Sequence, residues 1–175
     1  MKITETAIPD VLLFEPTVHG DSRGYFMETF RQSHFAERGI DLEFVQDNQS
    51  LSSQGTLRGL HYQLKRPQGK LVRAGAGSLF DVAVDMRRSS PTFGQWRGYT
   101  LSDSNYRQIY IPVGFAHGFC VLSETAEFLY KVSEYYSAEK EKGIMWNDRD
   151  IAIKWPTSKP ILSEKDKTNP ALKDI

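Results

Sequence analysis

A histidine stands near the middle of residues 57–63 (Leu-Arg-Gly-Leu-His-Tyr-Gln), which have the composition of a β-strand. Because successive side chains of a strand point to opposite faces, His61 should share a face with Gly59 and Gln63, while Arg58 points the other way. Glycine leaves room and glutamine is polar, so this face suits proton transfer better than core packing. The same pattern also fits a surface histidine with only a local hydrogen bond.

A histidine that acts as a general base needs a partner on its other ring nitrogen, most often a carboxylate. Asp81, Asp85 and Asp166 are candidates for this partner, and the sequence does not show which one folds against His61. A second histidine, His117, follows the tight turn that begins at Pro112. The unperturbed histidine pKa of about 6.5 lies close to neutral pH, as general base catalysis requires.

Short β-prone segments must position these residues, since turn signals separate many of them along the chain. Strands are expected at residues 11–14, 25–30, 43–46, 57–63, 70–74, 79–86, 96–101, 108–111, 115–122 and 126–132, and residues 151–155 alternate as a strand would. This pattern predicts an all-β sandwich or barrel. It lacks the βαβ alternation and the glycine-rich phosphate loop of a doubly wound nucleotide-binding fold.

The connecting segments are expected to hold one early helix and several loops. Residues 33–38 suit a helix that Ser33 caps and Gly39 ends. Turns or polar loops are expected at residues 19–24, 50–56 and 137–143. No internal repeat or low-complexity linker divides the chain, so residues 1–175 are expected to form a single domain.

The composition excludes several classes of protein. Lys+Arg and Asp+Glu both number 22, and a formal net charge of zero argues against a general nucleic-acid binder. Cys120 is the single cysteine, so no intramolecular disulfide is expected and a reducing compartment fits best. Residues 1–6 lack the apolar run of a signal peptide, and no run is long enough to cross a bilayer. A cytoplasmic protein with neither a nucleic-acid nor a membrane partner is therefore expected.

Residues 55–63 and 112–118 resemble the two motifs of the cupin superfamily, whose fold is a double-stranded β-helix, or jelly roll. Metal-binding cupins carry His-x-His in the first motif, where this chain has His61-Tyr62-Gln63. His61 and His117 alone fall short of the three side-chain ligands usual for a catalytic metal, so no metal site is expected.

A more specific resemblance runs through several motifs in order, from about Ile8 to Asp166. The motifs are TLRGLHYQ (56–63), PQGKLVR (67–73), FDVAVD (80–85), SPTFG (90–94), IPVGFAHGF (111–119), EFLYK (127–131), WND (146–148) and LSEKD (162–166). Together they resemble the dTDP-4-dehydrorhamnose 3,5-epimerase family. The resemblance implies an all-β, cupin-type jelly-roll β-sandwich with a few short helices.

The resemblance also implies a cofactor-independent isomerase that acts on a 4-keto-6-deoxyhexose carried by dTDP. The hydrogens at C3 and C5 are both α to the C4 ketone, so removing one gives an enolate, and returning a proton to the opposite face inverts the centre. The family roles fall on His61 as base, Asp166 as its orienting carboxylate, Tyr130 as acid and Lys70 as the cation that stabilises the enolate oxygen. Without the resemblance, Tyr130 would be expected in the core, and Lys70 and Asp166 at the surface.

The polar and charged side chains that the resemblance assigns to substrate binding are Arg23, Glu28, Gln46, Asp47, Asn48, Arg58, Lys70, His117, Glu141 and Lys165. Tyr136 is a weaker candidate for stacking on the base. In the family, the strand from Arg23 to Glu28 often serves the partner subunit's site, so a homodimer is expected. Two other hypotheses remain open: an epimerase that acts at one carbon only, and a non-catalytic cupin that binds sugar nucleotides.

Overall fold

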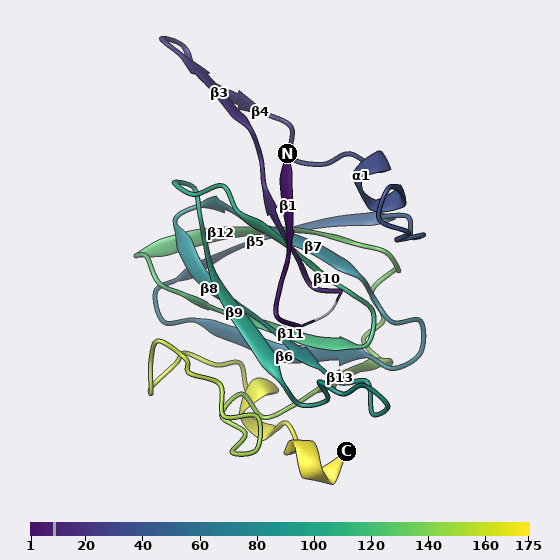
Figure 1. The fold of residues 1–175 in the computed structure, drawn as a ribbon. Coiled ribbons are helices and arrows are strands. Elements are labelled where there is room, and N and C mark those ends of the chain that lie inside the picture. Colours follow the sequence, from purple (N-terminus) through teal and green to yellow (C-terminus); the bar gives the residue numbers. More distant parts are fainter. Residues whose placement is uncertain (9) are drawn as a thin grey trace.

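The computed structural model describes residues 1–8 and 10–175, and two antiparallel sheets dominate it (Figure 1). The six-stranded sheet runs in spatial order through β1 (Lys2–Glu5), β2 (Leu12–Glu15), β10 (Gln108–Ile111), β7 (Lys70–Ala76), β12 (Thr125–Val132) and β5 (Gln46–Ser53). The five-stranded sheet runs through β13 (Glu141–Gly143), β6 (Leu57–Gln63), β11 (Phe115–Val121), β8 (Ser78–Asp85) and β9 (Trp96–Ser102).

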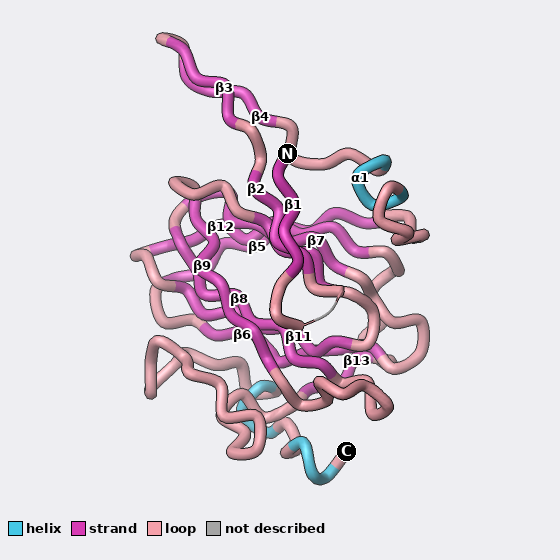
Figure 2. The backbone as a smooth tube through the Cα atoms, in the orientation of Figure 1, coloured by secondary structure: helices cyan, strands magenta, loops and turns pink. Residues whose placement is uncertain are grey.

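Helical structure is sparse and lies outside the sheets (Figure 2). It comprises α1 (Ser33–Ala36) and the 3-10 turns η1 (Asp166–Thr168) and η2 (Leu172–Asp174). The expectation of an all-β jelly-roll β-sandwich with a few short helices is thus confirmed. Within the described residues, 1–8 and 10–175, no helix is long and apolar enough to cross a membrane.

A third element, the hairpin of β3 (Val18–Asp21) and β4 (Gly24–Met27), projects away from both sheets (Figure 1). The prediction of a turn over residues 19–24 was too long, because residues 19–21 pair with β4 as strand. The predicted strand over residues 25–30 is shorter than expected and ends at Met27. The hairpin carries exposed aromatic rings at Tyr25 and Phe26.

The sandwich interior is filled by alternate side chains of both sheets. Val72 and Phe128 come from the six-stranded sheet, and Leu79, Phe119 and Val121 from the five-stranded sheet, all in one buried cluster. Burying apolar surface from both sheets in this way is the main stabilising contribution to such a fold. At one end of the sandwich, polar residues replace apolar ones on the inner faces and leave a cavity.

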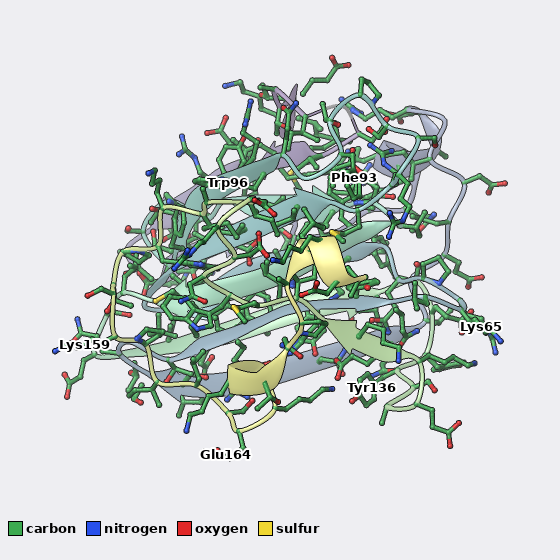
Figure 3. All side chains as sticks on the ribbon, turned by 90° about the horizontal axis from the view of Figure 1, so that it is seen from below. Lys65, Phe93, Trp96, Tyr136, Lys159 and Glu164 are labelled. Atoms are coloured by element: carbon green, nitrogen blue, oxygen red, sulfur yellow. The ribbon has the colours of Figure 1, made fainter. Side chains whose placement is uncertain are left out.

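The chain after β13 crosses the outer face of the five-stranded sheet (Figures 1 and 3). Residues 151–155 form no strand there, so the strand prediction was wrong. Their apolar side chains instead pack on Val82 and Val84 from outside the sheet. The Asp148 carboxylate accepts hydrogen bonds from the backbone N–H groups of Ile151 (2.9 Å) and Leu172 (2.8 Å), which fixes the path of the tail.

Other local predictions also need correction. Residues 50–53, expected as loop, belong to β5, which pairs with β12 along its whole length; the strand predicted from residue 43 begins only at Gln46. Propensity missed β5 because its inward side chains are polar rather than apolar. Residues 141–143 form β13 against β6 instead of continuing the charged loop. Ser33 lies inside α1, whose N-cap, Gln32, makes no side-chain capping bond.

Candidate active site

The cavity at the polar end of the sandwich has a volume of about 330 Å³ and opens between β5, β7 and β12 on one side and β6 and β11 on the other. Its walls are Gln46, Asn48, Ser50, Arg58, His61, Gln68, Lys70, His117, Phe119, Phe128, Tyr130, Tyr136 and Glu141. Larger hollows lie elsewhere on the molecule, but this one gathers two histidines, a lysine and a half-buried tyrosine, Tyr130. Convergent titratable groups make it the candidate active site.

His61 is held by Asp166, as the family resemblance implied. Its Nε2 lies 2.6 Å from Asp166 Oδ1, although the two residues are 105 positions apart in the chain. Burial alone would raise the pKa of Asp166, but hydrogen bonds from His61, Ser163 and the Gly59 backbone lower it, so the carboxylate is ionised at neutral pH. An ionised partner keeps hydrogen on Nε2 and leaves the Nδ1 lone pair free, 3.9 Å from Glu141 Oε1.

The other two carboxylates considered for this role serve different groups. Asp81, fully buried, binds His117, with 2.8 Å between Oδ2 and Nε2. Burial lowers the pKa of His117 despite this partner, so its ring is neutral at pH 7. Asp85 instead accepts hydrogen bonds from Arg87, Ser90 and Thr92 and fixes the loop after β8.

Lys70 begins β7 on the inner face of the six-stranded sheet, where it forms part of the cavity wall. Burial lowers the pKa of its ammonium to about 8, against the opposing charges of Glu141 and Asp81. At pH 7 Lys70 is therefore still a cation, and a partly desolvated one. Such a group stabilises a developing oxyanion far more than a solvated lysine would.

Tyr130 reaches the cavity from β12, on the sheet opposite His61. Burial and the neighbouring charge of Glu141 raise the pKa of its phenol, so the hydroxyl keeps its proton at neutral pH. Two side chains that can transfer protons, His61 and Tyr130, thus line the cavity from opposite sheets.

Arg58 lines the same cavity as His61, which contradicts the predicted placement on opposite faces. The cause is a bulge in the β6–β11 pairing, where His61 faces His117 but Arg58 faces Phe119. Three steps along β6 thus match two along β11, and the extra residue reverses the alternation. The space expected beside Gly59 is filled by the β11 backbone, because a Cβ there would lie 2.6 Å from the His117 carbonyl oxygen.

Several predicted binding residues meet at the cavity, namely Gln46, Asn48, Arg58, Lys70, His117 and Glu141. The Arg58 guanidinium is fixed by two hydrogen bonds to Ser52 Oγ, 3.1 and 3.2 Å long. Lys165 does not line this cavity, but it forms an ion pair with Glu141, which does. Tyr136 is also in the wall, and its hydroxyl donates to Glu141.

Besides Lys165, three predicted binding residues do not line the cavity of their own chain. Asp47 points to the outer face of β5 and pairs with Lys131 at 2.8 Å, because it alternates with the inward Gln46 and Asn48. Arg23 lies on the projecting hairpin and pairs with Asp21, and Glu28 just after it pairs with Arg31.

Sequence reasoning missed Ser50, Gln68, Phe119 and Phe128 as cavity residues. Strand alternation within the predicted strands could have found two of them, since Phe119 is two residues beyond His117 and Phe128 is two before Tyr130. Ser50 could not be found in this way, because its strand was not predicted. Gln68 lies in the loop before β7, where no such period applies.

The assembled groups suit proton transfer next to a carbonyl. His61 can remove a proton, Tyr130 can return one from the other side, and Lys70 can stabilise the negative charge that forms in between. Among residues 1–8 and 10–175, no three His, Cys, Asp or Glu side chains gather so as to hold a metal ion.

Comparisons with known proteins agree with this chemistry. The model of the dTDP-4-dehydrorhamnose 3,5-epimerase family matches residues 5–174. A dTDP-4-dehydrorhamnose 3,5-epimerase of Shigella flexneri is 60% identical over 168 residues, which cover 95% of this chain and 93% of the relative.

Solved structures give the same result. A Legionella pneumophila dTDP-6-deoxy-D-glucose-3,5-epimerase in complex with dTDP-4-keto-L-rhamnose has a TM-score of 0.96 at 50% identity, covering 98% of this chain and 93% of that one. A 3'-monoepimerase of Streptomyces bikiniensis in complex with dTDP-quinovose has a TM-score of 0.90 at 32% identity, and the match covers 97% of this chain and 87% of that one. The cavity chemistry, the near-complete family match and these relatives lead to one conclusion: the chain belongs to the dTDP-4-dehydrorhamnose 3,5-epimerase family.

Proposed function

We propose that this protein converts dTDP-4-dehydro-6-deoxy-D-glucose to dTDP-4-dehydro-L-rhamnose by inverting C3 and C5, without a metal or organic cofactor. The observation that carries the proposal is His61, oriented by Asp166 at 2.6 Å on one sheet, facing the Tyr130 phenol on the other. The family membership supports the same reaction.

In the proposed mechanism, His61 Nδ1 takes the proton from C3 or C5, and the electron pair moves onto the C4 oxygen as an enolate. Lys70, cationic at pH 7, holds that oxygen. Losing such a preorganised donor costs roughly 3 kcal/mol of transition-state stabilisation in other enzymes. Tyr130 then gives its proton to the opposite face of the same carbon, which inverts the centre.

Substrate binding is proposed to follow charge and position. Arg58, whose guanidinium donates to Ser52, is proposed to bind an oxygen of the diphosphate with its remaining donors. Gln46, Asn48, His117, Glu141 and Lys165 are proposed to hydrogen-bond the sugar and nucleoside, and Tyr136 to stack on the base. Asp47, which faces the outer surface of β5, is proposed to act through the backbone it shares with its inward neighbours.

The proposal extends to the state of the molecule. Residues 1–175 are proposed to act as one epimerase domain, in the cytoplasm, as a homodimer in which Arg23 and Glu28 serve the partner's cavity. The projecting hairpin supports this arrangement, because Tyr25 and Phe26 remain 57% and 71% exposed in the single chain.

Deuterium exchange tests the reaction. Incubated in heavy water with dTDP-4-dehydro-6-deoxy-D-glucose, the enzyme should place deuterium at both C3 and C5, as read by NMR, and form the L-sugar. Exchange at one carbon only would favour the hypothesis of a single-carbon epimerase. This hypothesis is tested because a structural neighbour, from Streptomyces bikiniensis, is a 3'-monoepimerase. Tight binding without exchange would mean a non-catalytic sugar-nucleotide binder and would overturn the proposal.

A further inference from the structure

The cavity has one purely apolar wall, formed by Phe119 and Phe128. Every other side chain in the described cavity lining carries a polar or charged group. The two rings stack with centroids 4.2 Å apart and an interplanar angle of 26°. They are 4% and 2% exposed and belong to the buried cluster between the sheets, so the wall is rigid.

The sugar of the proposed substrate has one matching group. Each ring carbon, C1 to C5, carries an oxygen (diphosphate, hydroxyl, ketone or ring oxygen), whereas C6, outside the ring, is a methyl group. An apolar surface stabilises a methyl group, and it disfavours a hydroxyl that must give up water without gaining a partner. If the C6 methyl group lies against the rings of Phe119 and Phe128, the oxygen atoms of the sugar can face the polar side chains of the other cavity walls.

The position of the wall agrees with the reaction. C6 is bonded to C5, which must lie between His61 and Tyr130. The ring centroid of Phe128 lies 5.2 Å from that of Tyr130 and 5.8 Å from that of His117. His117 is in turn the backbone pairing partner of His61 between β11 and β6. The wall therefore contacts Tyr130 directly and is connected to His61 through His117.

The wall also suits a group that moves during the reaction. When C5 inverts, the methyl group swings from one face of the ring towards the other. A flat aromatic surface can hold it in both positions, because dispersion and hydrophobic contact are not directional. A 6-hydroxyl would need a hydrogen bond that the inversion breaks.

We propose that Phe119 is a specificity-determining residue, whose ring holds the C6 methyl group and selects 6-deoxy over 6-hydroxy 4-keto sugars. The inference rests on the proposed function and names a subsite within it. Phe119 is the ring to test, since Phe128 contacts Tyr130 and His117 directly whereas Phe119 stacks on Phe128 alone.

The test compares kcat/KM for dTDP-4-dehydro-6-deoxy-D-glucose and its 6-hydroxy analogue, dTDP-4-dehydro-D-glucose, together with deuterium incorporation at C3 and C5. The wild type should prefer the 6-deoxy sugar by about 10- to 100-fold, the range expected when an apolar pocket meets an added hydroxyl. Phe119→Leu should slow exchange at C5 about tenfold more than at C3, because only C5 carries the methyl group. Phe119→Tyr should narrow the preference for the 6-deoxy sugar about tenfold.

Phe115→Leu is the matched control. Phe115 lies on the same strand, is equally buried at 4% and belongs to the same cluster, but it does not line the cavity. Phe115→Leu should change thermal stability, but the ratio of kcat/KM for the two sugars and the ratio of C5 to C3 exchange rates should keep their wild-type values. If Phe119→Tyr does not fold, the inference is still tested by the wild-type preference for the 6-deoxy sugar and by the exchange rates of Phe119→Leu.

Two results would overturn the inference. One is equal kcat/KM of the wild type for the two sugars. The other is that Phe119→Leu and Phe115→Leu have the same ratio of C5 to C3 exchange rates and the same ratio of kcat/KM for the two sugars. Absence of any exchange by the wild type on the 6-deoxy sugar would instead overturn the proposed function, so the two failures are distinguishable.

Discussion

The proposed base, His61, and the proposed acid, Tyr130, lie on different sheets, and this separation can be tested at Tyr130. In Tyr130→Phe, His61 can still remove a proton and return deuterium to the same face, so exchange should continue while inversion is lost. Product formation should fall by about 10²- to 10⁴-fold, the usual contribution of a positioned acid. NMR of the substrate in heavy water reads both events at once.

Tyr110→Phe provides the control for this change, since Tyr110 is buried in a separate cluster beside α1. It should keep wild-type inversion. Wild-type product formation by folded Tyr130→Phe would contradict the assignment of the acid.

Lys70 predicts how activity depends on pH. With a pKa of about 8, its ammonium loses the proton above that pH, and the enolate loses its cation. We expect kcat/KM to fall about tenfold per pH unit above pH 8. Lys70→Arg should have a lower maximal kcat/KM but no such fall above pH 8, because its guanidinium stays charged there.

This loss should not reflect unfolding caused by Lys70 itself. Its folded pKa lies below the ordinary 10.5, so between pH 8 and 10.5 the unfolded chain binds more protons and the Lys70 contribution to stability rises with pH. Lys131→Arg, at a lysine paired with Asp47 on the outer face, should keep the wild-type pH profile. An alkaline fall near pH 8 that persists in Lys70→Arg would rule out Lys70 as its source.

At the scale of the element, the β6 bulge depends on Gly59. A Cβ at this position would lie 2.6 Å from the His117 carbonyl oxygen and 2.8 Å from the Gly118 Cα, at a φ of +112°. Gly59→Ala should therefore cost roughly 3 kcal/mol of unfolding free energy, from backbone strain and overpacking together. It should also abolish activity, because β11 must move away from His61. Urea denaturation and the exchange assay measure the two effects.

Gly55→Ala separates strain from contact. Gly55 also has a positive φ, +77°, but nothing lies within 4 Å of its added Cβ. We expect a cost of only about 1 kcal/mol and retained activity. Equal costs at the two glycines would mean that the close approach of β11 contributes nothing.

Strand alternation explains which parts of the site could be predicted from sequence. The strands carrying His61, His117 and Tyr130 were all expected, because apolar and aromatic residues mark them. β5 was missed, since Gln46, Asn48 and Ser50 face a polar cavity and give no apolar period. The face of Arg58 was wrong because a single extra residue in β6 reverses every later side chain, and composition does not reveal a bulge.

Contacts between distant segments were beyond local reasoning of any kind. Asp81, Asp85 and Asp166 were equivalent candidates as partners of His61, and tertiary packing alone separates them. The motif resemblance supplied Asp166 where spacing could not.

At the scale of the whole molecule, the projecting hairpin leads to a test by complementation. If Arg23 serves the partner's cavity, His61→Ala and Arg23→Glu subunits should each be inactive alone. A mixed dimer would contain one cavity with both an intact His61 and an intact Arg23. Mixing the two variants should thus restore up to about a quarter of wild-type activity when subunits assort randomly, where half of the dimers are mixed and each has one working site.

The same mixture gives no rescue if each chain supplies its own Arg23, because every cavity would then carry one defect. Separately labelled subunits should show exchange between dimers by native mass spectrometry, which confirms that mixed dimers form. Mixed dimers without activity would contradict the shared site.

The pairing of His61 with Asp166 makes the proposed base depend on a segment that follows all the strands from β1 to β13. Strands β1 to β13 all precede Asp166, so a product of interrupted translation that stops after residue 143 has every strand yet lacks the carboxylate that orients the base. Such a fragment is expected to be inert even where its sheets form. The His61–Asp166 pair can form only after residue 166 has joined the folded sheets, so partial products that end before it are expected to carry out no proton transfer.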